Sequence, residues 1–129
     1  MFSMGFLEKY QPQLLSVLRI VIGLQILQYG MSKILHIPFV EMFAHLPPLI
    51  IVAGAIELVG GILMVAGLFT RIVAFILSGE MAFAYWLGHV GMSGKLLPIQ
   101  NHGDLAMIFC FVFLYIGAAG PGPWSFDRK

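Results

Sequence analysis

The sequence predicts an all-α, polytopic membrane protein built as an antiparallel bundle of four transmembrane helices. Of its 129 residues, 60% are hydrophobic and only 10% are charged, whereas a soluble domain carries about 25% charged residues. The mean hydropathy is +0.95. Four apolar runs approach or exceed the length that crosses a hydrocarbon core of ~30 Å, and short segments join them. The expected spans are approximately residues 14–37, 49–69, 72–90 and 103–119.

Composition also excludes several classes of protein. The net charge is +1, and no basic run suits a nucleic-acid partner. The single cysteine, Cys110, cannot form an internal disulfide, and no CxxC motif supports thiol exchange. The first apolar run is too long for a secretory signal peptide. We therefore expect one transmembrane domain over residues 1–129, embedded in a lipid bilayer and associated with a protein partner or a second copy.

The first span follows a mixed lead-in at residues 1–13 and is closed by Pro38. At 100° per residue, one of its faces gathers two glycines and two cations within an arc of about 80°. This face consists of Arg19, Gly23, Ile26, Gly30 and Lys33. Glycines permit close helix packing and cations avoid lipid, so the face is expected to point into the bundle.

The second span, about residues 49–69, has one carboxylate, Glu57, at its centre. Burying a carboxylate at the middle of a bilayer costs at least ~2.5–3.5 kcal/mol, so a compensating partner is required. Gly54, Gly60 and Gly61 lie around Glu57 and allow another helix to approach closely. The central question is therefore where the partner of Glu57 lies.

The third and fourth spans add two more carboxylates. A short turn at Thr70-Arg71 leads into the third span, which carries Glu80 near its middle. Residues 91–102 are expected to form the longest flexible segment. Asp104 lies in the first turn of the fourth span, where the helix dipole favours a negative charge. The glycine- and proline-rich tail that follows is expected to leave the membrane.

The distribution of basic residues predicts the orientation. One end of the bundle has Lys9, Arg71, Arg128 and Lys129 in its flanks, whereas the other has Lys95. The positive-inside rule therefore places both termini in the cytoplasm. This topology puts all four histidines at the outer end: His36, His45, His89 and His102.

Depth in the membrane suggests how the charges pair. The expected pairs are Arg19 with Glu80, and Lys33 with either Glu57 or Asp104. Such pairs can act only as polar contacts that fix helix register. Alternatively, they line a polar cavity in which a carboxylate moves protons or holds a head group. Four ionisable groups exceed what a small bundle needs for register, which favours the cavity.

A second candidate site lies at the outer end. His89, His102 and Asp104 flank one outer loop and are expected at the same end as His36 and His45, with which they are able to converge. Their spacing matches no closed metal-binding motif, so no metal site is predicted. The alternative is a titratable rim at which a quinone or substrate oxygen exchanges protons near neutral pH. No cofactor-binding motif is evident.

Taken together, several short motifs resemble those of the DoxX family of small four-span membrane proteins, in order and spacing. The matching pieces are Leu18-Arg19, Tyr29-Gly30-Met31-Ser32-Lys33, Glu57-Leu58-Val59-Gly60-Gly61, Gly67-Leu68-Phe69-Thr70-Arg71, Asn101 with Gly103 and Asp104, and the tail from Gly120 to Asp127. The resemblance extends from about Leu14 to Asp127. The residue before Gly30 is often histidine in this family and is Tyr29 here.

The resemblance implies a bacterial or archaeal inner membrane and an association with redox work. Some relatives are subunits of thiosulfate:quinone oxidoreductase, and others assist oxidative-stress or detoxification systems. The leading hypothesis is therefore a quinone-linked component of a membrane oxidoreductase, with quinone as the candidate substrate. The alternatives are a non-catalytic membrane anchor or assembly factor and, third, a small-solute or proton carrier.

Overall fold

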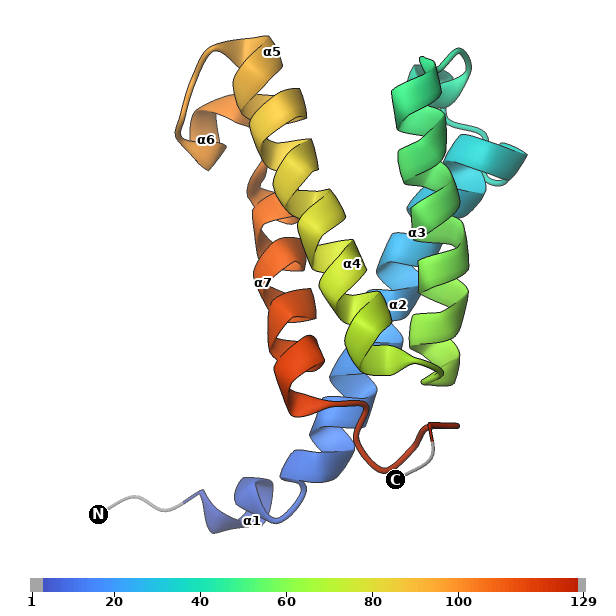
Figure 1. Ribbon diagram of the computed structural model, residues 1–129. Coiled ribbons are helices and arrows are strands. Elements are labelled where there is room, and N and C mark those ends of the chain that lie inside the picture. The colour runs from blue at the N-terminus through green and yellow to red at the C-terminus, as the bar shows by residue number, and fades with distance from the viewer. Residues whose placement is uncertain (1–3, 128–129) are drawn as a thin grey trace.

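The computed structural model describes residues 4–127, which are helical and contain no strand (Figure 1). The long helices are α2 (Gln11–Leu35), α3 (Pro48–Ala66), α4 (Thr70–Phe83) and α7 (Asp104–Ala119). The shorter elements are α1 (Gly5–Glu8), the 3₁₀ turn η1 (Glu41–Phe43), the π-helix η2 (Ala84–Val90), α5 (Gly91–Ser93) and α6 (Pro98–Asn101).

Three helical stretches of the described chain are long and apolar enough to cross a membrane. They are α2, α3 and the stretch Thr70–Ser93, in which α4 runs on through η2 and α5. The fourth apolar helix, α7, is shorter. The predicted class is confirmed at this level: an all-helical chain with several membrane-length apolar helices.

The long helices are arranged as two pairs. α2 packs along α3, and α4 packs along α7. Figure 1 shows the two pairs diverging toward the end that carries α5 and α6. The core contains fully buried side chains from all four helices, among them Ile26, Met64, Leu77 and Phe113. Apolar residues also cover much of the outer surface of the helices, as expected for contact with lipid.

Glycines bring the backbones of α2 and α3 into contact. A Cβ atom built at Gly30 would lie 2.3 Å from the backbone nitrogen of Leu58, and one at Gly61 would lie 2.8 Å from the Cα atom of Leu27. No side chain fits in these spaces. The prediction that the glycine-bearing face of the first span points into the protein is therefore confirmed.

The replacement Gly30→Ala is expected to push α2 away from α3. Overpacking of this kind typically costs ~1–3 kcal/mol, and more where backbone must move. We expect a lower melting temperature for the purified protein in detergent. Gly79→Ala is the matched control, because a Cβ atom at Gly79 meets nothing within 4 Å. Equal melting temperatures for the two variants would contradict the close packing at Gly30.

Two connections differ from the prediction. The turn between α3 and α4 lies at residues 67–69, whereas it was expected at Thr70-Arg71, which instead form the first turn of α4. Gly67 adopts φ 74°, a left-handed conformation that ends α3. The segment at residues 91–102, expected to be a long flexible loop, contains α5 and α6.

Candidate functional site

A buried ion pair joins α2 to α3. The Nζ atom of Lys33 lies 2.9 Å from Oε1 of Glu57, and the two side chains are 14% and 2% exposed. The close approach depends on Gly54, because a Cβ atom there would lie 2.8 Å from Cβ of Lys33. Of the two partners predicted for Lys33, Glu57 is the one that it contacts in the structure. The other, Asp104, is exposed at the start of α7.

A third ionisable group comes from α4. The carboxyl group of Glu80 lies within hydrogen-bonding range of the Glu57 carboxyl group and interacts electrostatically with Lys33. Its Oε1 atom is buried and has no hydrogen-bond partner among residues 4–127. Lys33, Glu57 and Glu80 thus form one charged cluster, which spans both helix pairs.

Aromatic rings enclose the cation of this cluster. The Lys33 ammonium lies 5.4 Å from the ring centre of Phe43 and 5.9 Å from that of Tyr29, within the range of cation–π attraction. Tyr29 also packs edge-on against Phe109 of α7, with 6.5 Å between ring centres. Tyr29, the residue before Gly30, therefore places an aromatic ring beside the ammonium. Sequence reasoning missed Phe43 because η1 lies in the connection between the first and second predicted spans, to which no role was assigned.

The composition of the charged cluster determines its chemistry. Two carboxyl groups face one ammonium, so the cluster carries one negative charge when both are ionised and is neutral with one bound proton. A low-dielectric interior disfavours an uncompensated charge. The cluster can therefore hold one proton between its two carboxyl groups.

The predicted pairing of Arg19 with Glu80 is wrong. Arg19 precedes Lys33 by 14 residues, about 21 Å along the helix, and is fully buried at the other end of the molecule. Its Nε donates to the backbone carbonyl of Met64 at 3.0 Å and its Nη2 to that of Trp124 at 2.5 Å. Its Nη1 donates to the carbonyl of Pro121. Arg19 therefore fixes the C-terminal tail instead of serving the charged cluster.

The tail is held at further points. The backbone nitrogen of Trp124 donates to Oγ of Ser16 at 3.0 Å. Asp127 accepts the backbone N–H groups of Phe69 and Thr70 at 2.6 and 3.0 Å, which caps the start of α4. The sequence prediction gave the tail no binding role, because backbone carbonyl acceptors leave no pattern in the side chains.

Asp127 makes docking of the tail pH-dependent. Burial would raise the pKa of this carboxyl group, but hydrogen bonds from Thr70 and Phe69 and the charge of Arg19 outweigh burial, so the pKa lies below its usual range. The stabilisation from Asp127 is therefore complete above the ordinary pKa of about 3.9, and it is lost as pH falls through the lowered value.

We expect wild-type tail docking to weaken only below about pH 4. Asp127→Asn should weaken docking already at neutral pH and remove the further loss on acidification. The fluorescence of Trp124, measured in a Trp86→Phe background, reports the environment of the tail. Parallel acid titrations of the two proteins would contradict this role for Asp127.

The loop at residues 91–102 has its own polar contacts. Nδ1 of His89 lies 3.1 Å from the backbone carbonyl oxygen of Asn101. The Asn101 side chain donates to the Tyr85 hydroxyl at 3.3 Å and to the carbonyl of Lys95 at 3.0 Å. His102 is exposed at the end of α6. Asn101 and Tyr85 therefore organise this loop, although sequence reasoning gave neither a structural role there.

His89 and His102 do not converge with His36 or His45. Figure 1 shows the segment between α2 and α3, which carries His36 and His45, on the other helix pair from α5 and α6. Within residues 4–127, no group of three histidine, cysteine, aspartate or glutamate side chains is placed to hold a metal ion. The structure does not bring His89, His102 and Asp104 to the charged cluster, and the proton-handling candidates that it does bring together are Lys33, Glu57 and Glu80.

Apolar helices around a buried charged cluster define a class of small helical membrane proteins. Within that class, the chain belongs to the DoxX family, whose model matches residues 14–90. A protein of Haemophilus influenzae is 45% identical over 98% of this chain and 97% of its own length, and is described as uncharacterized. An uncharacterized membrane protein of Mycobacterium tuberculosis is 29% identical over 92% of this chain and 82% of its own length. No solved structure matches the chain.

Proposed function

We propose that the protein is a quinone-linked component of a membrane oxidoreductase, in which the charged cluster handles the protons of a quinone head group. The observation that carries this proposal is the buried Oε1 atom of Glu80, which lacks a hydrogen-bond partner in the described chain. It lies next to a buried ion pair and near aromatic rings. A polar group left unpaired in an apolar interior is costly, and a bound ligand would supply the missing partner.

The proposed membrane arrangement accounts for access to this site. All four long helices cross the membrane as an antiparallel bundle, with both termini in the cytoplasm of a prokaryotic cell. The charged cluster then lies in the outer half of the bilayer, where an apolar quinone enters from the lipid between the two helix pairs.

The proposed chemistry separates electrons from protons. Reduction of a quinone to a quinol consumes two electrons and two protons. A partner oxidoreductase supplies the electrons, because the sequence contains no evident motif for a redox cofactor. Lys33 donates a hydrogen bond to a quinone oxygen, and Glu80 passes protons to it while Glu57 keeps the ammonium in place.

The test is quinone reduction by native membranes that contain the protein and its partner. Loss of a positioned proton donor typically lowers a rate by 10²–10⁴-fold, so Glu80→Gln is expected to reduce quinone turnover at least tenfold. The matched control is Glu41→Gln, which replaces an exposed carboxylate in η1. Unchanged turnover in Glu80→Gln at equal protein abundance would overturn the proposal.

A second candidate function is a membrane anchor or assembly factor for other proteins. It is favoured by the rigid attachment of the C-terminal tail to Arg19 and Ser16, which presents a fixed surface at one end. This function predicts that Glu57→Gln lowers protein abundance or partner recovery without changing turnover per complex.

A further inference from the structure

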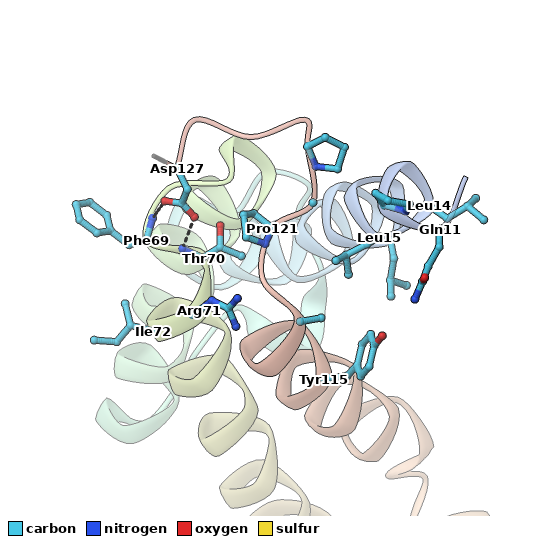
Figure 2. Close-up of a pocket in the computed structure, with 15 residues that line it drawn as sticks. Gln11, Leu14, Leu15, Phe69, Thr70, Arg71, Ile72, Tyr115, Pro121 and Asp127 are labelled. Carbon is cyan, nitrogen blue, oxygen red and sulfur yellow. Dashed lines mark hydrogen bonds between the residues drawn. The ribbon is translucent and has the colours of Figure 1, made fainter. Parts of the chain in front are cut away.

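A groove of about 1010 Å³ lies at the end of the molecule opposite the charged cluster. Its walls come from the N-terminal part of α2, the start of α4, the end of α7 and the tail (Figure 2). Several apolar side chains that line it are also exposed on the outside of the helices: Leu14, Leu18, Ile72 and Tyr115. The groove is therefore continuous with the surface that faces the acyl chains of the membrane.

One cation, Arg71, lines this groove. Figure 2 shows its guanidinium group between the start of α4 and the end of α7. Nη1 donates to the backbone carbonyls of Gly117, at 3.2 Å, and Ala118, which holds the group in place. Within residues 4–127, Arg71 makes no ion pair with a carboxylate, and its Nε and Nη2 atoms have no acceptor.

The groove is also lined by one carboxylate, Asp127, which already has hydrogen-bond partners. Asp127 accepts two backbone N–H groups, from Phe69 and Thr70, and interacts with the buried guanidinium of Arg19. The uncompensated charge in the groove is therefore that of Arg71. The groove is largely apolar, and its polar end carries one cation that has no carboxylate partner. Such a groove is complementary to an amphiphile with an anionic head group.

We infer that the groove binds an anionic glycerophospholipid of the surrounding membrane. The lipid phosphate contacts Nε and Nη2 of Arg71, and one acyl chain lies along Leu14 and Leu18 toward Tyr115. The groove lies on the side where the proposed topology puts the cytoplasmic leaflet, whose anionic lipids attract basic residues. This lipid site is separate from the charged cluster and goes beyond the proposed quinone function.

The experiment uses purified, delipidated protein in detergent, with lipid occupancy measured by native mass spectrometry. The probes are phosphatidylglycerol and phosphatidylcholine with identical acyl chains. Wild-type protein is expected to retain phosphatidylglycerol preferentially. Arg71→Gln should lower its affinity about fivefold, the factor that corresponds to the ~1 kcal/mol contributed by one basic residue at an anionic membrane surface.

Two further variants separate lipid binding from folding. Lys95→Gln removes an exposed cation at the opposite end and should leave lipid retention unchanged. Leu18→Trp fills the groove while leaving Arg71 intact, and it should lower retention of phosphatidylglycerol even if Arg71→Gln fails to fold. Equal binding of the two lipids by the wild type, or full retention in Leu18→Trp, would overturn the proposal.

Discussion

Replacing Lys33 with methionine is expected to lower the free energy of unfolding by ~3–5 kcal/mol, the usual cost of leaving one partner of a buried ion pair unpaired. Glu57 is 2% exposed and loses its cation, while Glu80 remains beside it as a second carboxyl group. We expect a sharp drop in the melting temperature in detergent and in the yield of membrane-inserted protein.

The double variant Lys33→Met with Glu57→Leu separates a structural role from a functional one. Replacing a whole buried ion pair by apolar side chains is often neutral or stabilising, and the remaining Glu80 carboxyl group can stay neutral by holding a proton. The double variant should therefore recover most of the lost stability. If the pair only fixes helix register, recovery of stability restores quinone turnover as well. The proposed function predicts a stable but inactive protein.

The exposed Lys95 provides the control for the Lys33→Met variant and the double variant. Lys95→Met removes a charge from the loop at residues 91–102 without touching the charged cluster, and it is expected to shift the melting temperature little. A wild-type melting temperature for Lys33→Met alone would contradict the importance of the ion pair for stability.

Arg19→Gln is expected to release the C-terminal tail and to cost ~3 kcal/mol or more. The guanidinium group satisfies the backbone carbonyls of Met64, Pro121 and Trp124, and each hydrogen bond from a charged donor contributes about 1.5–3 kcal/mol. Glutamine is too short to reach all three. Limited proteolysis should therefore cut the tail of the variant much faster than that of the wild type.

Two further substitutions test the specificity of this effect. Gln25→Ala removes an exposed polar side chain from the same helix and should leave the tail protected. Arg19→Lys keeps the charge but loses the planar fork that reaches several carbonyls at once, so it is expected to protect the tail only partly. Protease resistance of Arg19→Gln equal to that of the wild type would show that other contacts hold the tail.

The sequence correctly predicted the apolar helices and the inward face of α2, because both depend on residues that are close together in the chain. Hydropathy and length predicted the apolar helices, and the 100° periodicity of α2 correctly placed Gly30 and Lys33 on an inward face. The depth of Lys33 and Glu57 in their spans limited the partners of Lys33 to two, and the structure has one of them.

The errors concern contacts that no local pattern encodes. Arg19 was assigned to Glu80 because carboxylates are the partners that a sequence shows, whereas its actual acceptors are backbone carbonyls of α3 and the tail. Glu80 contacts Glu57, and like charges are not expected to pair unless a proton lies between them. Phe43 lies beside Lys33 only because the segment between α2 and α3 folds back over the cluster.

The most direct test of the quinone proposal is photoaffinity labelling of the purified protein with a ring-azido quinone analogue, followed by peptide mapping. The proposed function predicts labelling of the peptides around Lys33, Glu57 and Glu80, competition by unlabelled quinone, and loss of labelling in Glu80→Gln. Labelling spread evenly over the lipid-facing helices, or unchanged in Glu80→Gln, would contradict it.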